Sequence, residues 1–112
     1  MKKIEAIIRS EKVGDVRRAL ETVGFSGLTL TQVQGHGKQK GTTQKLGGHE
    51  YKVGILPKTK IEIVAEEDEV DPIIDAIISA GKTGNIGDGK IFIYDIQNVI
   101  RIRTGEKGKE AL

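Results

Sequence analysis

The sequence predicts a single α+β domain in the order βαβ, long loop, βαβ. Three observations support this prediction. Alternating polar and apolar residues, typical of half-buried strands, recur along the 112 residues. Two stretches with apolar residues at helical spacing lie between them. The segment 35–56, rich in glycine and without periodicity, separates two halves of similar design.

The first half begins with a strand over residues 2–9, where apolar and polar residues alternate. Ser10 is placed to cap a helix that ends at Gly24. Gly14 in its first turn costs up to about 1 kcal/mol relative to alanine, which predicts a weak helix start. The apolar residues of this helix are Val13, Val16, Leu20 and Val23. Residues 28–34 alternate again and predict a second strand.

The second half follows a loop at about 36–56, whose length indicates a functional role. Residues 59–66 alternate and predict a third strand. A second helix follows, with Asp68 or Asp71 as its cap and Pro72 near its start. Its apolar residues are Val70, Ile73, Ile74, Ile77 and Ile78, and it closes at Gly81.

A loop at about 82–90 then leads into a fourth strand over residues 90–96. Residues 99–103 are expected to be extended, within a C-terminal segment and charged tail at about 99–112. This order describes a ferredoxin-like sandwich, with two helices on one face of a four-stranded antiparallel sheet. The last strand is apolar on both faces: Ile91 and Ile93 on one, and Phe92, Tyr94 and Ile96 on the other. A second copy of the chain is the simplest cover for the other face, so we expect a homo-oligomer.

Composition excludes several classes of protein. There is no cysteine, hence no disulfide, thiolate metal site or cysteine nucleophile. There is no apolar run of about 18 residues and no secretory leader, so we expect a cytoplasmic protein. His36 and His49 are a poor metal pair, and no nucleophile stands with a base, so we expect no enzyme. Lysines gather between residues 37 and 60, which points to an anionic ligand or partner surface.

The most informative segment is Thr83–Tyr94, which carries Gly84, Gly87 and Gly89 ahead of Lys90. Such a loop lets backbone N–H groups converge, and Arg101 and Arg103 downstream suit a polyphosphate. The spacing matches neither the Walker pattern nor the dinucleotide fingerprint. On this pattern alone, a hairpin loop before an edge strand and a solvated pair of arginines remain open.

The chain resembles the PII nitrogen-regulatory signal proteins from Met1 to its tail. The segments that carry the resemblance are Gly27–Val33, Gly37–Gly41, Leu56–Val64, Thr83–Phe92 and Ile100–Gly105. The family implies a homotrimer with nucleotide sites in the clefts between subunits. It implies sensing of ATP against ADP together with 2-oxoglutarate, and docking of the long loop onto targets. Those targets include the ammonium transporter, glutamine synthetase and nitrogen-assimilation regulators, with membrane contact only through a transporter and no nucleic acid.

The resemblance also implies roles for individual residues. The nucleotide would be bound by Gly27, Leu28, Thr29, Gly35, Gly37, Lys38, Gln39, Glu62, Val64, Gly87, Asp88, Gly89, Lys90, Arg101 and Arg103. The 2-oxoglutarate would be bound by Gln39, Lys40, Gly41, Lys58 and Gly87, with Gln39 also holding Mg²⁺. Taken alone, Lys58 reads as a surface lysine and Glu62 as the polar face of a strand. Tyr51 is a candidate for uridylylation or adenylylation, although its surroundings depart from the family's pattern.

Three alternatives stay open. The first is a nucleotide-only PII relative specialised for a single target such as nitrogenase, favoured by loop changes such as Gly47 and Gly54. The second is an RNA-binding module on the same fold, which lacks the aromatic stacking platform here because Phe92 and Tyr94 are the only strand aromatics. The third is a trimeric metal-tolerance protein, for which soft or histidine ligands are scarce.

Overall fold

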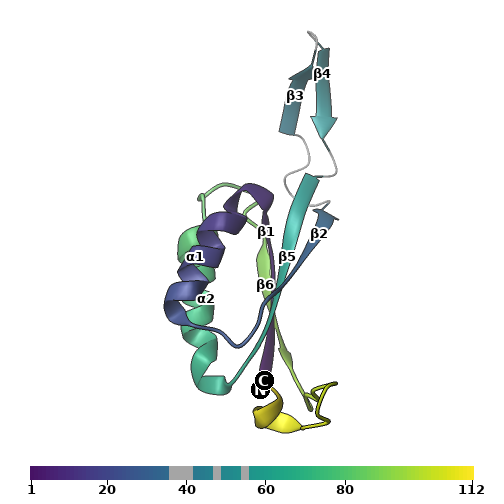
Figure 1. The fold of residues 1–112 in the computed structure, drawn as a ribbon. Coiled ribbons are helices and arrows are strands. Elements are labelled where there is room, and N and C mark those ends of the chain that lie inside the picture. Colours follow the sequence, from purple (N-terminus) through teal and green to yellow (C-terminus); the bar gives the residue numbers. More distant parts are fainter. Residues whose placement is uncertain (36–41, 47–48, 54–55) are drawn as a thin grey trace.

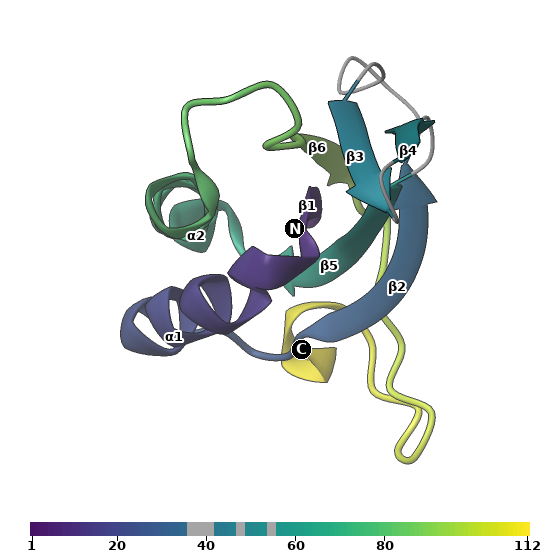
Figure 2. The same ribbon diagram turned by 90° about the horizontal axis from the view of Figure 1, so that it is seen from above.

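A computed structural model describes residues 1–35, 42–46, 49–53 and 56–112. Four strands form one antiparallel sheet in the order β2-β5-β1-β6, and two helices cover one face of it (Figure 1). The strands are β1 (Lys2–Arg9), β2 (Thr29–Gly35), β5 (Leu56–Ala65) and β6 (Lys90–Asp95), and the helices are α1 (Val13–Val23) and α2 (Glu67–Gly81). Figure 2 shows both helices on the same side of the sheet. The predicted α+β fold is confirmed.

The core lies between the sheet and the helices. Every second residue of β1 and β5 points to the helices, so Ile4, Ile61 and Ile63 are almost completely buried. They meet Leu20 of α1 and Ile73 of α2. Burying side chains of this size contributes about 1.5–3 kcal/mol each. Among the described residues, no helix is long and apolar enough to span a membrane.

The first helix begins later than predicted, and its buried apolar face is shorter than predicted. Residues Ser10–Lys12 form a 3₁₀ turn, and α1 begins at Val13 without a side-chain cap. The Ser10 hydroxyl lies 3.0 Å from the Thr59 hydroxyl instead. Val23 is 42% exposed, so the apolar stripe ends one turn earlier than predicted. The end at Gly24 is confirmed, with φ of 91°.

The cap of α2 was assigned to the wrong residues. The N-cap is Glu66, whose backbone N–H donates to the Glu69 side chain at 3.0 Å, while the Glu66 carboxylate accepts from the Glu69 backbone. This reciprocal pair is a capping box. Asp68 and Asp71 therefore lie inside the helix. Pro72 is also inside it, in the second turn, where its missing N–H leaves one carbonyl without its usual partner.

Strand β5 begins at Leu56, three residues earlier than predicted. Proline cannot donate to a ladder, so Pro57 is an unusual residue for the interior of a sheet. Strand β1, however, ends opposite Lys58, so Pro57 pairs only with Gln34 of β2. At that point β5 has a free edge on its other side, where proline is tolerated.

The long loop contains a strand pair that its sequence did not reveal. Strands β3 (Thr42–Leu46) and β4 (His49–Val53) are antiparallel. Figure 1 shows the pair beyond the end of the four-stranded sheet. Lysine and glutamate, which both strands together contain, have low strand propensity and weaken the strand signal here.

The C-terminal segment turns where an extended stretch was expected. Ile100 makes an isolated bridge with Lys107, and residues 102–104 form a turn between them. Gly105, with φ of 73°, supplies the left-handed residue this reversal needs. The chain closes with the 3₁₀ helix η2 (Gly108–Ala111). The expectation of an extended run over 99–103 is therefore wrong.

Candidate functional site

The strand register places several of the predicted site residues on the face of the sheet that no helix covers. Because Ile61 and Ile63 point to the core, Lys58, Glu62 and Val64 point the other way. Thr29 of β2 pairs with Glu62. Lys90 of β6 pairs with Ile7, which in turn pairs with Lys60. These residues share that open face.

The loop between α2 and β6 has the backbone geometry predicted from its glycines. Gly84, Gly87 and Gly89 have φ of 90°, 108° and 96°. A Cβ atom on Gly89 would lie 1.7 Å from the backbone oxygen of Ile7, which is an impossible contact. Only glycine fits there, because the loop passes directly against β1.

Asp88 is the centre of this loop. Its carboxylate accepts hydrogen bonds from the Thr83 hydroxyl at 2.5 Å and from the backbone N–H groups of Thr83 and Gly84, both at 2.9 Å. Arg9 Nε donates to it at 3.0 Å. These donors, with the Thr83 hydroxyl first, hold the pKa of the Asp88 carboxyl far below its usual range. The carboxylate is thus used to shape its own loop.

Arg9 was not predicted as a site residue, yet it ties β1 to this loop. Besides Asp88, its guanidinium contacts the backbone oxygen of Ile86, with Nη2 donating at 2.9 Å. Its side chain is 14% exposed. The only sequence signal was its position as the last open-face residue of β1, one residue before the predicted cap Ser10.

Lys58 is buried rather than on the surface, so the simple reading of a solvated lysine is wrong. It is 8% exposed, and its Nζ donates to the backbone oxygen of Gly87 at 2.5 Å. Burial, and secondly the positive charge of Arg9, lower the pKa of the Lys58 ammonium. A Cβ on Gly35 would lie 3.1 Å from Lys58 Cγ, so Gly35 leaves room for this side chain.

Arg101 and Arg103 lie at the opposite end of the molecule from the glycine loop. Strand β6 runs between the two, and its six residues span roughly 20 Å. Arg101 donates to Glu106 Oε1 at 2.8 Å and to the backbone oxygen of Glu110 at 3.0 Å. Arg103 is exposed on the turn. One chain therefore does not bring these arginines to its own glycine loop.

Glu62 belongs to a charged network on the open face. Lys3 Nζ lies 2.9 Å from Glu62 and 3.8 Å from Glu5. Tyr94 donates to Glu5 at 3.1 Å, and the Lys3 ammonium stands 5.1 Å from the centre of its ring. The hydrogen bond from Lys3 is the main cause that lowers the pKa of Glu62. Val64 lies beside it on β5, and Leu28, just before β2, packs partly against the core.

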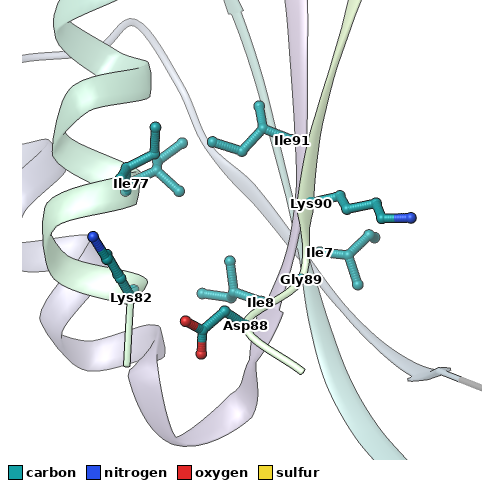
Figure 3. A pocket seen from close by; sticks show the side chains of 10 residues that line it. Ile7, Ile8, Ile77, Lys82, Asp88, Gly89, Lys90 and Ile91 are labelled. Carbon is teal, nitrogen blue, oxygen red and sulfur yellow. The ribbon is translucent and has the colours of Figure 1, made fainter. Parts of the chain in front are cut away.

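A cavity of about 260 Å³ opens on the helix side of the glycine loop (Figure 3). Its walls are mainly isoleucines of β1, α2 and β6, and the loop residues Asp88 and Gly89 close one end. In Figure 3 Asp88 points toward α2, whereas Lys90 extends to the other side of the strands. Lys90 is one of the residues that line the cavity, but its side chain extends to the open face.

Gly37, Lys38, Gln39, Lys40 and Gly41 lie outside the described residues. Tyr51 lies in β4, where the backbone pairs it with Gln44.

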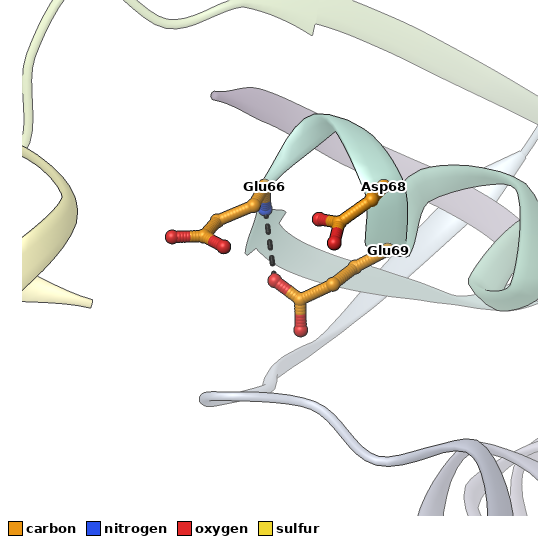
Figure 4. Close-up of side chains that lie close together, drawn as sticks. All are labelled: Glu66, Asp68 and Glu69. Carbon is orange, nitrogen blue, oxygen red and sulfur yellow. Dashed lines mark hydrogen bonds between the residues drawn. The ribbon is translucent and has the colours of Figure 1, made fainter.

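One acidic cluster in the described part of the chain has the spacing of a metal site. It comprises Glu66, Asp68 and Glu69 at the start of α2 (Figure 4). The dashed bond in Figure 4 is half of the capping box, and Lys109 stands 3.5 Å from Glu66. Capping of the helix explains Glu66 and Glu69, and no other observation in the described residues points to a cation.

Comparison with known proteins agrees with this architecture. The family model described as nitrogen regulatory protein P-II matches residues 1–106. The chain is 54% identical to nitrogen regulatory protein P-II of Pasteurella multocida (strain Pm70) and 55% identical to P-II 1 of Escherichia coli (strain K12), with both chains fully covered. It is 51% identical to P-II 2 of Methanothermobacter thermautotrophicus, of which it covers 97%. These names describe regulators rather than enzymes, as the sequence led us to expect. The chain belongs to the nitrogen regulatory protein P-II family.

Proposed function

We propose that this regulator binds ATP or ADP in clefts between the chains of a homotrimer, and that Mg²⁺ and 2-oxoglutarate join ATP there. The observation that carries the proposal is the preformed loop Gly84–Lys90. Its three glycines have positive φ, and Arg9 and Lys58 hold its backbone from β1 and β5. A backbone concavity with little left to order suits phosphate oxygens.

The separation of basic groups supports a site shared between chains. Lys90 stands at one end of β6, whereas Arg101 and Arg103 follow its other end. A nucleotide on one loop can meet such arginines only if a second copy presents its C-terminal turn. In this arrangement the open-face residues Thr29, Glu62 and Val64 of one copy would line the base and ribose.

The same loop suits a second anion. Lys58 touches the Gly87 carbonyl and is well shielded from water, so it suits a carboxylate of 2-oxoglutarate. When bound, Mg²⁺ would separate this dicarboxylate from the triphosphate, whose like charges otherwise repel. Gln39 would supply a neutral oxygen to the ion. Because the ion would bridge both ligands, each should strengthen binding of the other.

The regulatory output would pass through the segment 36–56. Strands β3 and β4 extend beyond the sheet (Figure 1), where a partner can reach them. The partner we propose is a nitrogen-metabolism protein: the ammonium transporter, glutamine synthetase or a nitrogen-assimilation regulator. Tyr51 is the candidate for covalent modification within this segment.

Calorimetric titration tests the proposal. ATP and ADP are each titrated with Mg²⁺, with and without 2-oxoglutarate. We expect both nucleotides to bind, and 2-oxoglutarate to bind only when Mg-ATP is present. If both nucleotides bind but 2-oxoglutarate never does, the protein is a nucleotide-only relative specialised for one target. If neither nucleotide binds, the proposed function is wrong.

A further inference from the structure

We propose that Thr83, Asp88 and Arg9 form an internal clamp that positions the phosphate loop, with the Asp88 side chain shaping the loop instead of contacting the nucleotide. This inference rests on the proposed function. It adds Thr83 and Arg9 as positioning residues and gives Asp88 a different role from that of its glycine neighbours.

The first argument is that the Asp88 carboxylate already has its donors. The Thr83 hydroxyl and Arg9 Nε reach Oδ1 at 2.5 and 3.0 Å, and two backbone N–H groups reach Oδ2 at 2.9 Å. A carboxylate accepts about four such bonds. Two of the backbone donors, those of Thr83 and Gly84, are therefore committed to Asp88. The Asn85 N–H donates to Thr83 Oγ1 at 3.1 Å, so the backbone donors left for phosphate would be those of Ile86 to Lys90.

The second argument is electrostatic. An unpaired aspartate in a phosphate loop would repel the ligand by several kcal/mol at close range, depending on the local dielectric. Here the Arg9 guanidinium stands 3.0 Å away and balances the charge. The Arg9–Asp88 pair thus lets a negative group organise the loop without opposing the ligand's charge.

The third argument concerns anchoring. One guanidinium donates both to Asp88 and to the Ile86 carbonyl, so Arg9 fixes the loop at two points to the end of β1. Gly89 then passes against Ile7 of the same strand, two residues earlier. The loop is thus anchored to the sheet on both sides of Gly87. Lys58 donates to the backbone carbonyl of Gly87 itself.

A matched pair of variants at Thr83 tests the clamp. Thr83→Val removes the hydroxyl at nearly constant volume, and Thr83→Ser keeps it. We expect Thr83→Val to weaken Mg-ATP and Mg-ADP binding about tenfold, and Thr83→Ser to stay within about twofold, since losing a hydrogen bond to a charged group is worth about one power of ten. The amide NMR signals of Gly87 and Gly89 should move in the valine variant and return in the serine variant. If Thr83→Val and Thr83→Ser bind Mg-ATP and Mg-ADP with equal affinity, the clamp is wrong.

Asp88→Asn gives a test that depends on sign. If Asp88 acted only as a charge near phosphate, its neutralisation would tighten nucleotide binding. The clamp predicts the opposite, weaker binding by about tenfold, because an amide NH₂ cannot accept from the donors that face one carboxylate oxygen, and the charge that pairs with Arg9 is gone. Tighter binding would overturn the proposal.

A charge control separates anchoring from general electrostatics. Arg9→Met should weaken binding as Thr83→Val does, whereas Lys12→Met removes a nearby cation that pairs with Asp15 and should change little. Equal losses of affinity in Arg9→Met and Lys12→Met would overturn the anchoring role of Arg9.

If the wild-type protein binds no nucleotide while its loop signals still respond to Thr83→Val, the proposed function and the clamp's part in binding both fail. If wild-type binds and all variants match it, only the clamp fails.

Discussion

At the scale of single residues, two neighbours fix the same loop by different means. Gly89 does so by having no side chain, since its Cα passes directly against the backbone of Ile7. Asp88 does so by its charge, which gathers donors from Thr83, Gly84 and Arg9. The first effect does not depend on pH and the second does, so they can be measured separately.

We predict that Gly89→Ala lowers the free energy of unfolding by at least about 2 kcal/mol. Positive φ alone costs a residue with a side chain roughly 1–2 kcal/mol, and the clash with the Ile7 carbonyl adds to this. Urea unfolding measures the change. Gly84→Ala, also at positive φ but with nothing within 4 Å, should cost less, and Gly27→Ala, in open space, least. Equal costs at all three positions would contradict the reading of the loop.

The stabilising effect of Asp88 should depend on pH with a definite sign. Its donors depress its pKa in the folded protein, so the folded state favours the carboxylate. The stabilisation is complete above the unfolded pKa of about 3.9 and is lost as the pH falls toward the folded value. The stability difference between wild type and Asp88→Asn should therefore be constant from neutral pH to about pH 5, and shrink below pH 4. Unfolding at a series of pH values measures it; a difference that grows in acid would contradict the assignment.

At the scale of elements, clear alternation allowed strands to be predicted well. Strand β1 was predicted over 2–9 and is Lys2–Arg9. The start of α2 was missed because glutamate is an uncommon N-cap and two aspartates nearby were more typical ones. Strands β3 and β4 were missed because their polar residues carry little strand signal.

The candidate site shows the same division. The glycine loop is a local pattern and was predicted. Arg9 could not be, because its contact with Asp88 joins residues 79 positions apart and depends on where β1 ends relative to that loop. Lys58 was predicted through the family resemblance, while its burial follows from a register that one sequence does not reveal.

For the capping box, we predict that Glu69→Ala destabilises the protein by about 1 kcal/mol, because the Glu66 backbone N–H loses its partner. Thermal and urea unfolding both measure this. Asp75→Ala, an exposed carboxylate in the middle of the same helix, is the matched control and should be neutral or slightly stabilising. A loss at Asp75 equal to that at Glu69 would show that helix charge, not the cap, is responsible.

At the scale of the whole molecule, one edge of the open face of the sheet exposes large apolar side chains. Phe92 and Tyr94 of β6 lie on this face and are 44% and 45% exposed. Contiguous exposure of large apolar side chains marks an interface. The same face carries Lys3, Glu5 and Glu62, which would fix how copies meet. A closed ring of chains would also join the glycine loop of one copy to the arginines of the next.

We therefore predict that light scattering gives a mass of three times the 12.2 kDa of one chain. Phe92→Lys should shift the mass toward that of a single chain, because burying an ammonium in an interface is costly. The variant should still fold, because Phe92 is 44% exposed and does not belong to the buried core. Glu21→Lys on the exposed side of α1 has a larger change in charge and should leave the mass unchanged.

A wild-type protein of 12.2 kDa, or a Phe92→Lys variant that keeps the threefold mass, would contradict assembly through this face. In the first case the arginines could not reach a glycine loop at all, and nucleotide affinity should then be unaffected by Arg101→Ala.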